Sequence, residues 1–400
     1  MSTRRTPYGT RPFSISLMKK LFAAFAVALL SVSSAFAQIT IPSPTINAKS
    51  WLLLDATSDQ ILASNEPDMR IEPASLTKLM TAYVVFDALN EKRITMDQMV
   101  TVSTKAWKVD AESSKMFIEP RVPVSVHDLV YGLIVQSGND AAVALAETIA
   151  GTEDAFVAMM NREAERIGMK STHFSNSHGL PSPENYSTAR DLATLASHLA
   201  VDHPELYKIY STKEFTYNKI RQPNRNRLLW LDPTVDGMKT GHTENAGYCL
   251  ISTAKRPNGK NGDRRLISIV LGTSSDQMRT QESQKLLNWG FLNFDTVRLY
   301  AKDEAVDTPN VWKGSQNSLK IGFNHDLYVT VPKGTADKIK TSLTRKDPLV
   351  APIDKNSTVG TLKVTADGKT IAELPVLALE QVGQAGMFGR ALDSLRLLLH

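Results

Sequence analysis

The hydrophobic periodicity of this 400-residue chain changes near residue 295, and that change is the strongest constraint on its fold. Before it, strand-like runs lie at both ends of a segment whose middle carries helical patterns. The strand-like runs are residues 50–55, 60–64, 213–217, 248–253 and 266–271, and the helical patterns are residues 75–89, 126–136, 141–150, 152–167, 189–200 and 281–290. The first two runs, with a short turn between them, indicate a hairpin. We predict an α+β domain over residues 38–295 whose sheet gathers distant segments.

After residue 295 only short alternating runs occur. They are residues 318–323, 327–331, 339–343, 358–365 and 370–374. Turn-forming residues separate them, including Pro332-Lys333-Gly334 and Asp367-Gly368. We therefore predict a small all-β domain over residues 296–382. No cluster of chemically reactive side chains marks it, so its predicted role is structural or that of a spacer.

The first 37 residues carry five basic residues and no acidic one. An apolar stretch at residues 21–32 is followed by Ala35-Phe36-Ala37, the pattern of a signal-peptidase site. We predict a cleaved secretory signal over residues 1–37, with an uncleaved anchor as the alternative and Met18 as an alternative start. Without this segment the formal charge of +5 falls to zero, so the composition does not indicate a nucleic acid or other polyanionic partner.

Residues 383–400 form a second special segment. At 100° per residue, one side of a helix would carry Phe388, Ala391, Leu392, Leu395, Leu398 and Leu399. The other side is polar or charged, with Leu397 as the exception. Such a helix either docks on its own domain or lies flat in a membrane surface. We favour the interfacial helix, because the preceding sequence already has the pattern of a complete domain.

Ser75-Leu76-Thr77-Lys78 lies at the start of a strong helical pattern, just after Pro73. The i, i+3 spacing puts Ser75 and Lys78 on one helix face. A serine hydroxyl becomes a good nucleophile when a neighbouring base takes its proton, and a lysine can be that base when desolvation or a second cation lowers its pKa. The helix N-terminus also offers N–H groups to a developing oxyanion. Alone the motif is weak, since a serine beside a solvated lysine is common.

Two later motifs are also weak alone. Ser137-Gly138-Asn139 separates two helical patterns and is either a helix cap or a second hydroxyl and an amide for catalysis. Lys239-Thr240-Gly241 is either an exposed turn or an edge strand that pairs with an extended peptide, with Gly241 allowing close approach of the substrate. Strict alternation places Lys239 and Thr240 on opposite faces, so the pattern does not explain how both serve one site.

Metal chemistry finds no support in the sequence. The eight His residues include no His-Glu-x-x-His motif, and Cys249 is the single cysteine. We expect neither a metal nor another cofactor.

The ordered trio is far more specific than its parts. Ser-x-x-Lys, Ser-x-Asn and Lys-Thr-Gly in this order are the signature of penicillin-binding proteins and class A β-lactamases. The chain resembles the low-molecular-mass penicillin-binding proteins, the serine D-Ala-D-Ala carboxypeptidases of the bacterial cell envelope. The resemblance covers nearly the whole mature chain and is carried by residues 73–81, 136–141, 178–180, 186–191, 221–226 and 235–241. The β domain and tail are similar to the layout of the enterobacterial carboxypeptidases five and six.

This resemblance implies a catalytic domain of the DD-peptidase and β-lactamase type, with an antiparallel sheet flanked by helices and a helical subdomain. A small all-β domain and a C-terminal amphipathic helix follow it. The helix is implied to hold the exported enzyme on the periplasmic face of the inner membrane. The implied substrate is the peptidoglycan pentapeptide, with β-lactam antibiotics as covalent inhibitors and no cofactor.

The resemblance also implies catalytic roles at matching positions. Ser75 is implied as the nucleophile that forms an acyl-enzyme with the penultimate D-Ala, and Lys78 as its general base. Ser137 is implied to relay the proton to the leaving amine, while Lys239 tunes the local potential. Asn139 is implied to contact both the substrate and the lysine base.

Further roles by resemblance concern substrate binding. The oxyanion hole is implied to consist of the backbone N–H groups of the nucleophile and of His242. Thr240 and Arg279 are the candidates for holding the substrate carboxylate, beside Gly241. Arg225 is a candidate for contacting peptidoglycan or bracing the sheet.

Three other functions compete with this interpretation. A murein DD-endopeptidase uses the same chemistry on a longer leaving group, and the sequence discriminates it poorly. A class A β-lactamase needs a loop glutamate, and Glu184 does not fit that loop pattern. A non-catalytic murein-binding protein would not require all three motifs intact.

Overall fold

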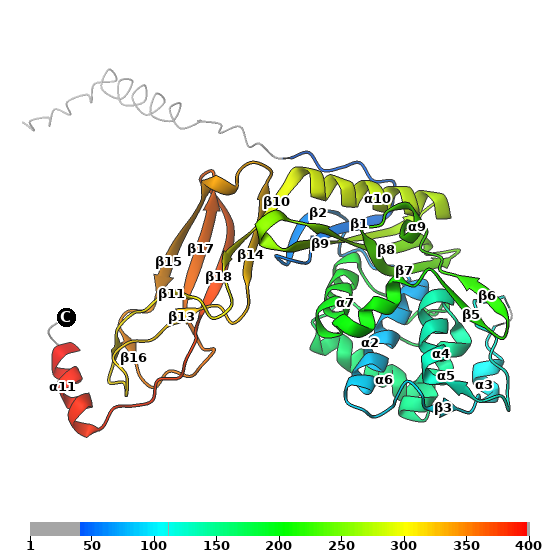
Figure 1. Ribbon diagram of the computed structural model, residues 1–400, viewed down its shortest axis with the longest axis horizontal. Coiled ribbons are helices and arrows are strands. Elements are labelled where there is room, and N and C mark those ends of the chain that lie inside the picture. The colour runs from blue at the N-terminus through cyan, green and yellow to red at the C-terminus, as the bar shows by residue number, and fades with distance from the viewer. Residues whose placement is uncertain (1–40, 111, 398–400) are drawn as a thin grey trace, which may run out of the picture. The chain divides into compact units, whose positions relative to one another are not determined.

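The computed structural model describes residues 41–110 and 112–397 (Figure 1). The predicted signal over residues 1–37 and the last three residues of the predicted tail lie outside these ranges. Within them, no helix combines the length and the apolarity needed to cross a bilayer.

One five-stranded antiparallel sheet organises the first domain, in the order β2-β1-β9-β8-β7. Its strands are β1 (Ser50–Asp55), β2 (Gln60–Asn65), β7 (Val235–Thr243), β8 (Gly247–Pro257) and β9 (Asp263–Thr273). The pairing of β1 with β2 confirms the predicted hairpin. β1 also pairs with β9, so that Trp51 lies opposite Val270. The sheet therefore gathers distant segments, as predicted, and β7 lies at its edge.

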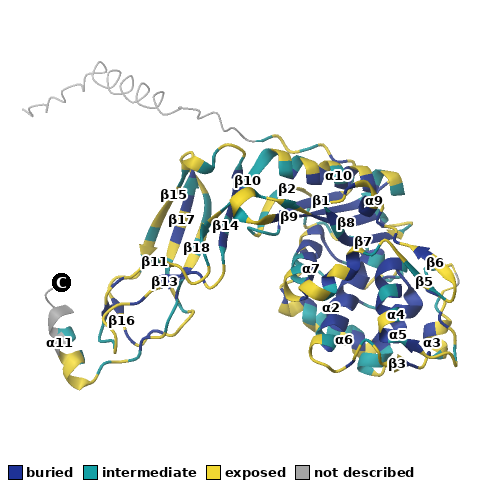
Figure 2. Ribbon diagram, viewed as in Figure 1, coloured by how far each residue is buried: buried dark blue, intermediate teal, exposed yellow. Residues whose placement is uncertain are grey.

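The central strands β1, β8 and β9 are buried on both faces over most of their length, which explains why they read as apolar runs. Leu52 and Leu54 of β1 join the large core shared with the helices on one face. Leu53, between them, packs in a second core with Leu286 of α10 (Asp276–Asn293). Figure 1 shows α10 on one side of the sheet and α2 and α7 on the other, and Figure 2 shows the buried strands between them.

Most helices lie between β2 and β7 in the chain and form the helical part of the domain. They are η1 (Ala74–Thr77, a 3-10 turn), α2 (Lys78–Asn90), α3 (Thr104–Trp107), α4 (Val126–Tyr131), η2 (Gly132–Gln136, a π-helix), α5 (Asn139–Ala150), α6 (Glu153–Arg166), α7 (Ala189–Asp202), α8 (Pro204–Tyr207), η3 (Lys208–Ser211) and α9 (Leu228–Leu231). A short 3-10 turn, η4 (Gly259–Asn261), joins β8 to β9.

Two short two-stranded sheets accompany these helices. One pairs β3 (Met99–Val100) with β4 (Val124–Ser125), and the other pairs β5 (Glu214–Tyr217) with β6 (Ile220–Pro223). The predicted strand at residues 213–217 is thus β5, outside the main sheet. The reason is local: Asn218 and Lys219 both have positive φ, the geometry of a tight two-residue hairpin turn that returns the chain at once.

The second domain is all β, as predicted. Its five-stranded sheet has the order β11-β13-β18-β17-β15, and β10 pairs with β14 while β12 pairs with β16. These strands are β10 (Phe294–Tyr300), β11 (Ala305–Asp307), β12 (Val311–Trp312), β13 (Ile321–Gly322), β14 (Leu327–Pro332), β15 (Ile339–Arg345), β16 (Leu349–Val350), β17 (Thr358–Ala366) and β18 (Lys369–Ala378), with one 3-10 turn, η5 (Ala336–Lys338). Val329, Val364 and Val376 lie in its own apolar core.

A buried carboxylate links the main sheet of the first domain to the β10–β14 strand pair of the second domain. Asp55, at the end of β1, is fully buried and its Oδ2 accepts hydrogen bonds from Arg264 Nε (2.8 Å), Thr296 Oγ1 (2.6 Å) and Thr330 Oγ1 (2.7 Å). Because Thr296 lies on β10 and Thr330 on β14, this carboxylate links the main sheet to the first strand pair of the β domain.

A helix, α11 (Met387–Leu397), lies within the predicted tail. The carboxylate of its Asp393 accepts a hydrogen bond from the backbone N–H of Lys313 at 2.7 Å. Phe388, on the predicted apolar side, is 93% exposed. The membrane contact of this helix stays a prediction.

Candidate active site

Ser75 lies in the 3-10 turn η1, which leads directly into α2 at Lys78. The i, i+3 spacing brings the two side chains together, and Lys78 Nζ donates to Ser75 Oγ at 3.0 Å. A loop presses against this turn from one side. A Cβ on Gly179, whose φ is +87°, would lie 1.8 Å from the carbonyl oxygen of Ala74. Only a glycine allows the two backbones to approach so closely, so this loop holds the turn that carries Ser75 in place.

Lys78 is almost fully buried, with 1% of its surface exposed. Besides Ser75 Oγ, its Nζ donates to Asn139 Oδ1 at 2.7 Å and to the carbonyl oxygen of His178 at 2.6 Å. Burial, followed by the charge of Arg225, lowers the pKa of Lys78 to about 7, whereas the charge of Asp140 acts in the opposite direction. A large fraction of Lys78 is therefore neutral at neutral pH and able to take a proton.

Ser137 and Asn139 come from the junction between the π-helix η2 and α5. Ser137 has a left-handed backbone (φ +67°), and Asn139 is the first residue of α5. The neighbouring Asp140 carboxylate accepts hydrogen bonds from the backbone N–H groups of Met116, Phe117, Ile118 and Ala141, at 2.8–3.2 Å. The junction is therefore tied to the preceding loop as well as to its own helix.

Lys239 reaches the same place from the edge strand β7. Its Nζ donates to Ser137 Oγ at 2.9 Å and to the carbonyl oxygen of Thr240 at 3.0 Å. Burial lowers the pKa of Lys239 well below its usual value, and the charges of Lys78, Arg225 and Arg279 add to this effect. The long lysine side chain resolves the alternation problem, because it reaches Ser137 while Thr240 lines the pocket itself.

Gly241 allows another segment to approach β7 closely, and in this structure that segment is the turn before Ser75. A Cβ at this position would lie 3.1 Å from Pro73 O and 3.3 Å from Ala74 Cβ, in the turn that carries Ser75. Sequence reasoning assigned the close approach to a substrate. The structure gives a second reason for glycine here, since β7 packs against the nucleophile turn.

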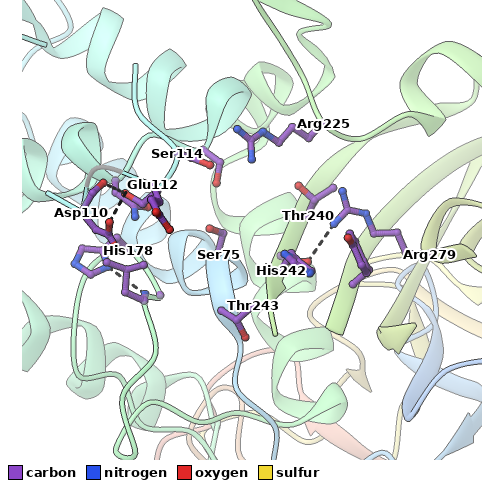
Figure 3. Close-up of a pocket in the computed structure, with 17 residues that line it drawn as sticks. Ser75, Asp110, Glu112, Ser114, His178, Arg225, Thr240, His242, Thr243 and Arg279 are labelled. Atoms are coloured by element: carbon purple, nitrogen blue, oxygen red, sulfur yellow. Dashed lines mark hydrogen bonds between the residues drawn. The ribbon is translucent and has the colours of Figure 1, made fainter. Parts of the chain in front are cut away.

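Arg279 and His242 complete the wall formed by β7. Arg279, on α10, donates from Nη1 to the carbonyl oxygen of Gly241 at 3.1 Å and pairs with Asp276. The His242 ring lies 4.0 Å, between centroids, from that of Tyr248 on β8. In Figure 3, Arg279 and Arg225 lie on the side of Thr240 and His242, opposite His178.

These side chains surround one pocket of about 360 Å³, a volume suited to a small ligand (Figure 3). Eight of the predicted residues line it, namely Ser75, Ser137, Asn139, Arg225, Thr240, Gly241, His242 and Arg279. Lys78 and Lys239, the other two, are buried and hydrogen-bonded to the two serines. In the described part of the chain, no group of three or more His, Cys, Asp and Glu side chains could hold a metal ion.

Sequence reasoning missed several residues of this site. The carbonyl oxygen of His178 is an acceptor for Lys78, and the segment 178–180 had been noted for resemblance alone. Asp140 follows Asn139 directly, but the sequence does not show that its carboxylate binds a distant loop. Asp110 and Glu112 line the wall near His178, and no sequence signal pointed to them (Figure 3).

The arrangement can perform acyl transfer. Ser75 lines the pocket and is hydrogen-bonded to the partly neutral Lys78, and a second lining serine, Ser137, is hydrogen-bonded to Lys239. The candidate nucleophile Ser75 is thus within hydrogen-bond reach of its candidate base Lys78, and Ser137, a second proton donor, is within hydrogen-bond reach of Lys239. Cationic groups on the β7 side suit a substrate with a carboxylate.

The chain was compared with known families, and two of them match it. Residues 37–275 match the family described as "D-alanyl-D-alanine carboxypeptidase". Residues 294–384 match the family described as "Penicillin-binding protein 5, C-terminal domain". The two matches together span almost all of the described residues.

Several known proteins are similar to this chain over most of its length. The D-alanyl-D-alanine carboxypeptidase DacC of Escherichia coli (strain K12) is 44% identical over 392 residues, which covers 96% of this chain and 97% of that protein. DacA of Haemophilus influenzae is 44% identical over 372 residues, covering 92% and 93%. The crystal structure of penicillin-binding protein 5 from H. influenzae superposes with a TM-score of 0.81 at 44% identity, covering 86% of this chain and all of that one.

Proposed function

The chain belongs to the D-alanyl-D-alanine carboxypeptidase family of serine peptidases, and we propose that it removes the terminal D-Ala of peptidoglycan pentapeptide stems through an acyl-enzyme on Ser75. The observation that carries this proposal is the hydrogen bond between Ser75 and a buried Lys78 whose pKa is lowered to about 7. Enzymes of this family are hydrolases that act on D-Ala-D-Ala substrates.

In the proposed acylation step, neutral Lys78 takes the hydroxyl proton as Ser75 Oγ attacks the carbonyl carbon of the penultimate D-Ala. A neutral amine has two N–H bonds and one lone pair. Asn139 Oδ1 and the His178 carbonyl oxygen can only accept, so they bind the two N–H groups. The lone pair is then directed at Ser75 Oγ. The backbone N–H groups of Ser75 and His242 are assigned to the developing oxyanion.

The leaving D-Ala needs a proton and a place for its carboxylate. Ser137, whose Oγ accepts a hydrogen bond from Lys239 Nζ at 2.9 Å, is assigned to relay to the leaving amine the proton that Lys78 took from Ser75, so that Lys78 becomes neutral again. Thr240, Arg225 and Arg279 line the pocket and supply the positive and hydrogen-bonding wall for the carboxylate. A water molecule then gives a proton to neutral Lys78 and attacks the ester carbonyl, and Lys78 passes that proton to Ser75 Oγ as the ester bond breaks, which completes the hydrolysis.

β-Lactam antibiotics are proposed as covalent inhibitors acting on the same serine. Penicillin-binding protein D2 from Listeria monocytogenes has been solved in ampicillin-bound form, at 31% identity and a TM-score of 0.56 with this chain. DD-endopeptidase action on cross-links is a second candidate, because it uses the same acylation chemistry on a longer leaving group.

For location, we propose export through the segment at residues 1–37 and peripheral attachment to the periplasmic face of the inner membrane through residues 383–400. The amphipathic pattern of this tail and the 93% exposure of Phe388 support the attachment. Deleting residues from 384 onward should release the protein from membranes in fractionation while leaving D-Ala release from a soluble peptide unchanged.

Purified protein tests the enzymatic proposal directly. Wild-type protein should release D-Ala from a pentapeptide and form a covalent adduct with labelled penicillin, whereas Ser75→Ala should do neither. D-Ala release by folded Ser75→Ala protein would exclude Ser75 as the nucleophile. Comparing D-Ala release with cross-link cleavage on purified murein distinguishes the carboxypeptidase from the endopeptidase.

A further inference from the structure

The Ser177-His178 segment is attached to α2 by two consecutive carbonyl groups. The carbonyl oxygen of Ser177 accepts from Thr81 Oγ1 at 2.5 Å, and that of His178 accepts from Lys78 Nζ at 2.6 Å. Thr81 and Lys78 are one helical turn apart on the same face of α2. The position of this segment therefore decides where Lys78 finds one of its acceptors.

A buried glutamate holds the same segment from the opposite side. Glu153, the first residue of α6, is 6% exposed, and its Oε1 accepts from Ser177 N–H at 3.0 Å and from Ser177 Oγ at 2.7 Å. Its Oε2 pairs with Lys105 Nζ of α3 at 2.9 Å. Lys105 thus holds the Glu153 carboxylate in place, and the carboxylate in turn holds the loop through Ser177.

The His178 side chain adds to this arrangement. Its Nδ1 accepts the N–H of Leu180 at 3.2 Å, so its Nε2 carries the hydrogen and faces Glu153 Oε1 at 3.5 Å. Burial first, and then the charge of Lys78, lowers the pKa of His178 to about 4. The neutral ring therefore keeps the Leu180 hydrogen bond under ordinary conditions.

We propose that Glu153, supported by Lys105, is a positioning residue for the Lys78 base. It holds the Ser177-His178 segment so that the His178 carbonyl binds one N–H of neutral Lys78 and the lone pair points at Ser75. This inference rests on the proposed function, in which Lys78 is the general base.

Glu153 acts through geometry in this proposal, because the groups that shift the pKa of Lys78 are Arg225 and Asp140. A neutral side chain that still accepts the Ser177 hydrogen bonds should therefore replace it. Glu153→Gln keeps a carboxamide oxygen at this position, whereas Glu153→Ala removes the acceptor. Asp154→Ala is the matched control, because Asp154 is an exposed acid in the same helical turn.

The experiment measures kcat and KM for D-Ala release, the rate of acylation by benzylpenicillin, and thermal stability. We expect Glu153→Ala to lower kcat and the acylation rate about 10- to 100-fold, the scale of a misplaced catalytic group, with KM changed less than about twofold. Glu153→Gln should stay within about threefold of wild type, with the acidic limb of its pH profile still near 7. Asp154→Ala should match wild type.

Lys105→Met provides a second variant that should fold, because the Lys105 side chain is more than half exposed. This variant removes the partner of Glu153 Oε2, so it should lower kcat and the acylation rate, though less than Glu153→Ala does, with KM changed little. If both Glu153→Ala and Lys105→Met showed wild-type rates, the positioning role of Glu153 would be refuted while the proposed function would stand. Wild-type protein that releases no D-Ala and forms no penicillin adduct would instead refute the proposed function on which it rests.

Discussion

Asp140 should support both the stability of the domain and the acid–base behaviour of Lys78, and Asp140→Asn separates the two contributions. The wild-type carboxylate is 1% exposed. Its Oδ1 accepts from Met116 N–H and Ala141 N–H, both at 2.9 Å, and its Oδ2 accepts from Phe117 N–H at 2.8 Å and Ile118 N–H at 3.2 Å. An asparagine amide has one oxygen, so its NH₂ group would face one of these pairs of donors.

The expected loss of stability follows from counting those donors. Two backbone N–H groups lose their acceptor, and each unsatisfied buried donor costs about 1–3 kcal/mol. The free energy of unfolding should therefore fall by about 2–6 kcal/mol, a large part of the total for a typical domain. Urea unfolding followed by tryptophan fluorescence measures this difference. Asp154→Asn, at an exposed position, is the control and should change stability by less than about 0.5 kcal/mol.

The same variant should also shift the pH dependence. The negative charge of Asp140 raises the pKa of Lys78, so its removal lowers that pKa. Because neutral Lys78 is the active form, the acidic limb of kcat/KM should move from about 7 to lower pH. A stability change below 1 kcal/mol would refute the hydrogen-bond count, and a limb that moved to higher pH would refute the electrostatic argument.

Three further substitutions test the charge near Lys78, the packing of the Gly179 loop and the buried Asp55 carboxylate. Arg225→Gln removes a charge that lowers the pKa of Lys78, so the acidic limb of kcat/KM should move to higher pH, and an unchanged limb would contradict this. Gly179→Ala places a Cβ 1.8 Å from the Ala74 carbonyl oxygen and should abolish penicillin labelling together with a marked loss of thermal stability; normal labelling would show that the loop can move away. Asp55→Ala leaves the guanidinium of Arg264 buried without its carboxylate and should cost about 3–5 kcal/mol in urea unfolding, whereas a loss below 1 kcal/mol would mean that other groups satisfy it.

The sequence predicted well what depends on local periodicity and motif order. The i, i+3 contact of Ser75 with Lys78 follows from helix geometry alone, and the edge position of the Lys239 strand follows from its motif. The all-β character of the second domain follows from its alternating runs and turn residues. In each case the relevant partners are close in the chain or belong to one recognised pattern.

What escaped sequence reasoning depends on contacts between distant segments. The His178 carbonyl that binds Lys78 is a backbone atom, which carries no residue-type signal. Glu153 is an ordinary acid in the first turn of a helix until the Ser177 loop is placed beside it. Lys239 reaches Ser137 because its side chain is long, a fact that strand alternation does not include.

The strand order also determines when this protein can become reactive. β1 lies between β2 and β9, and the Lys239 strand joins β9 only through β8. The sheet therefore cannot be completed until residues 266–271 are available to pair with residues 50–55. Loop closure over such distances makes folding slow, and the Ser75 pocket forms late. Penicillin labelling of the newly made chain would thus report the completion of folding as well as the presence of the serine.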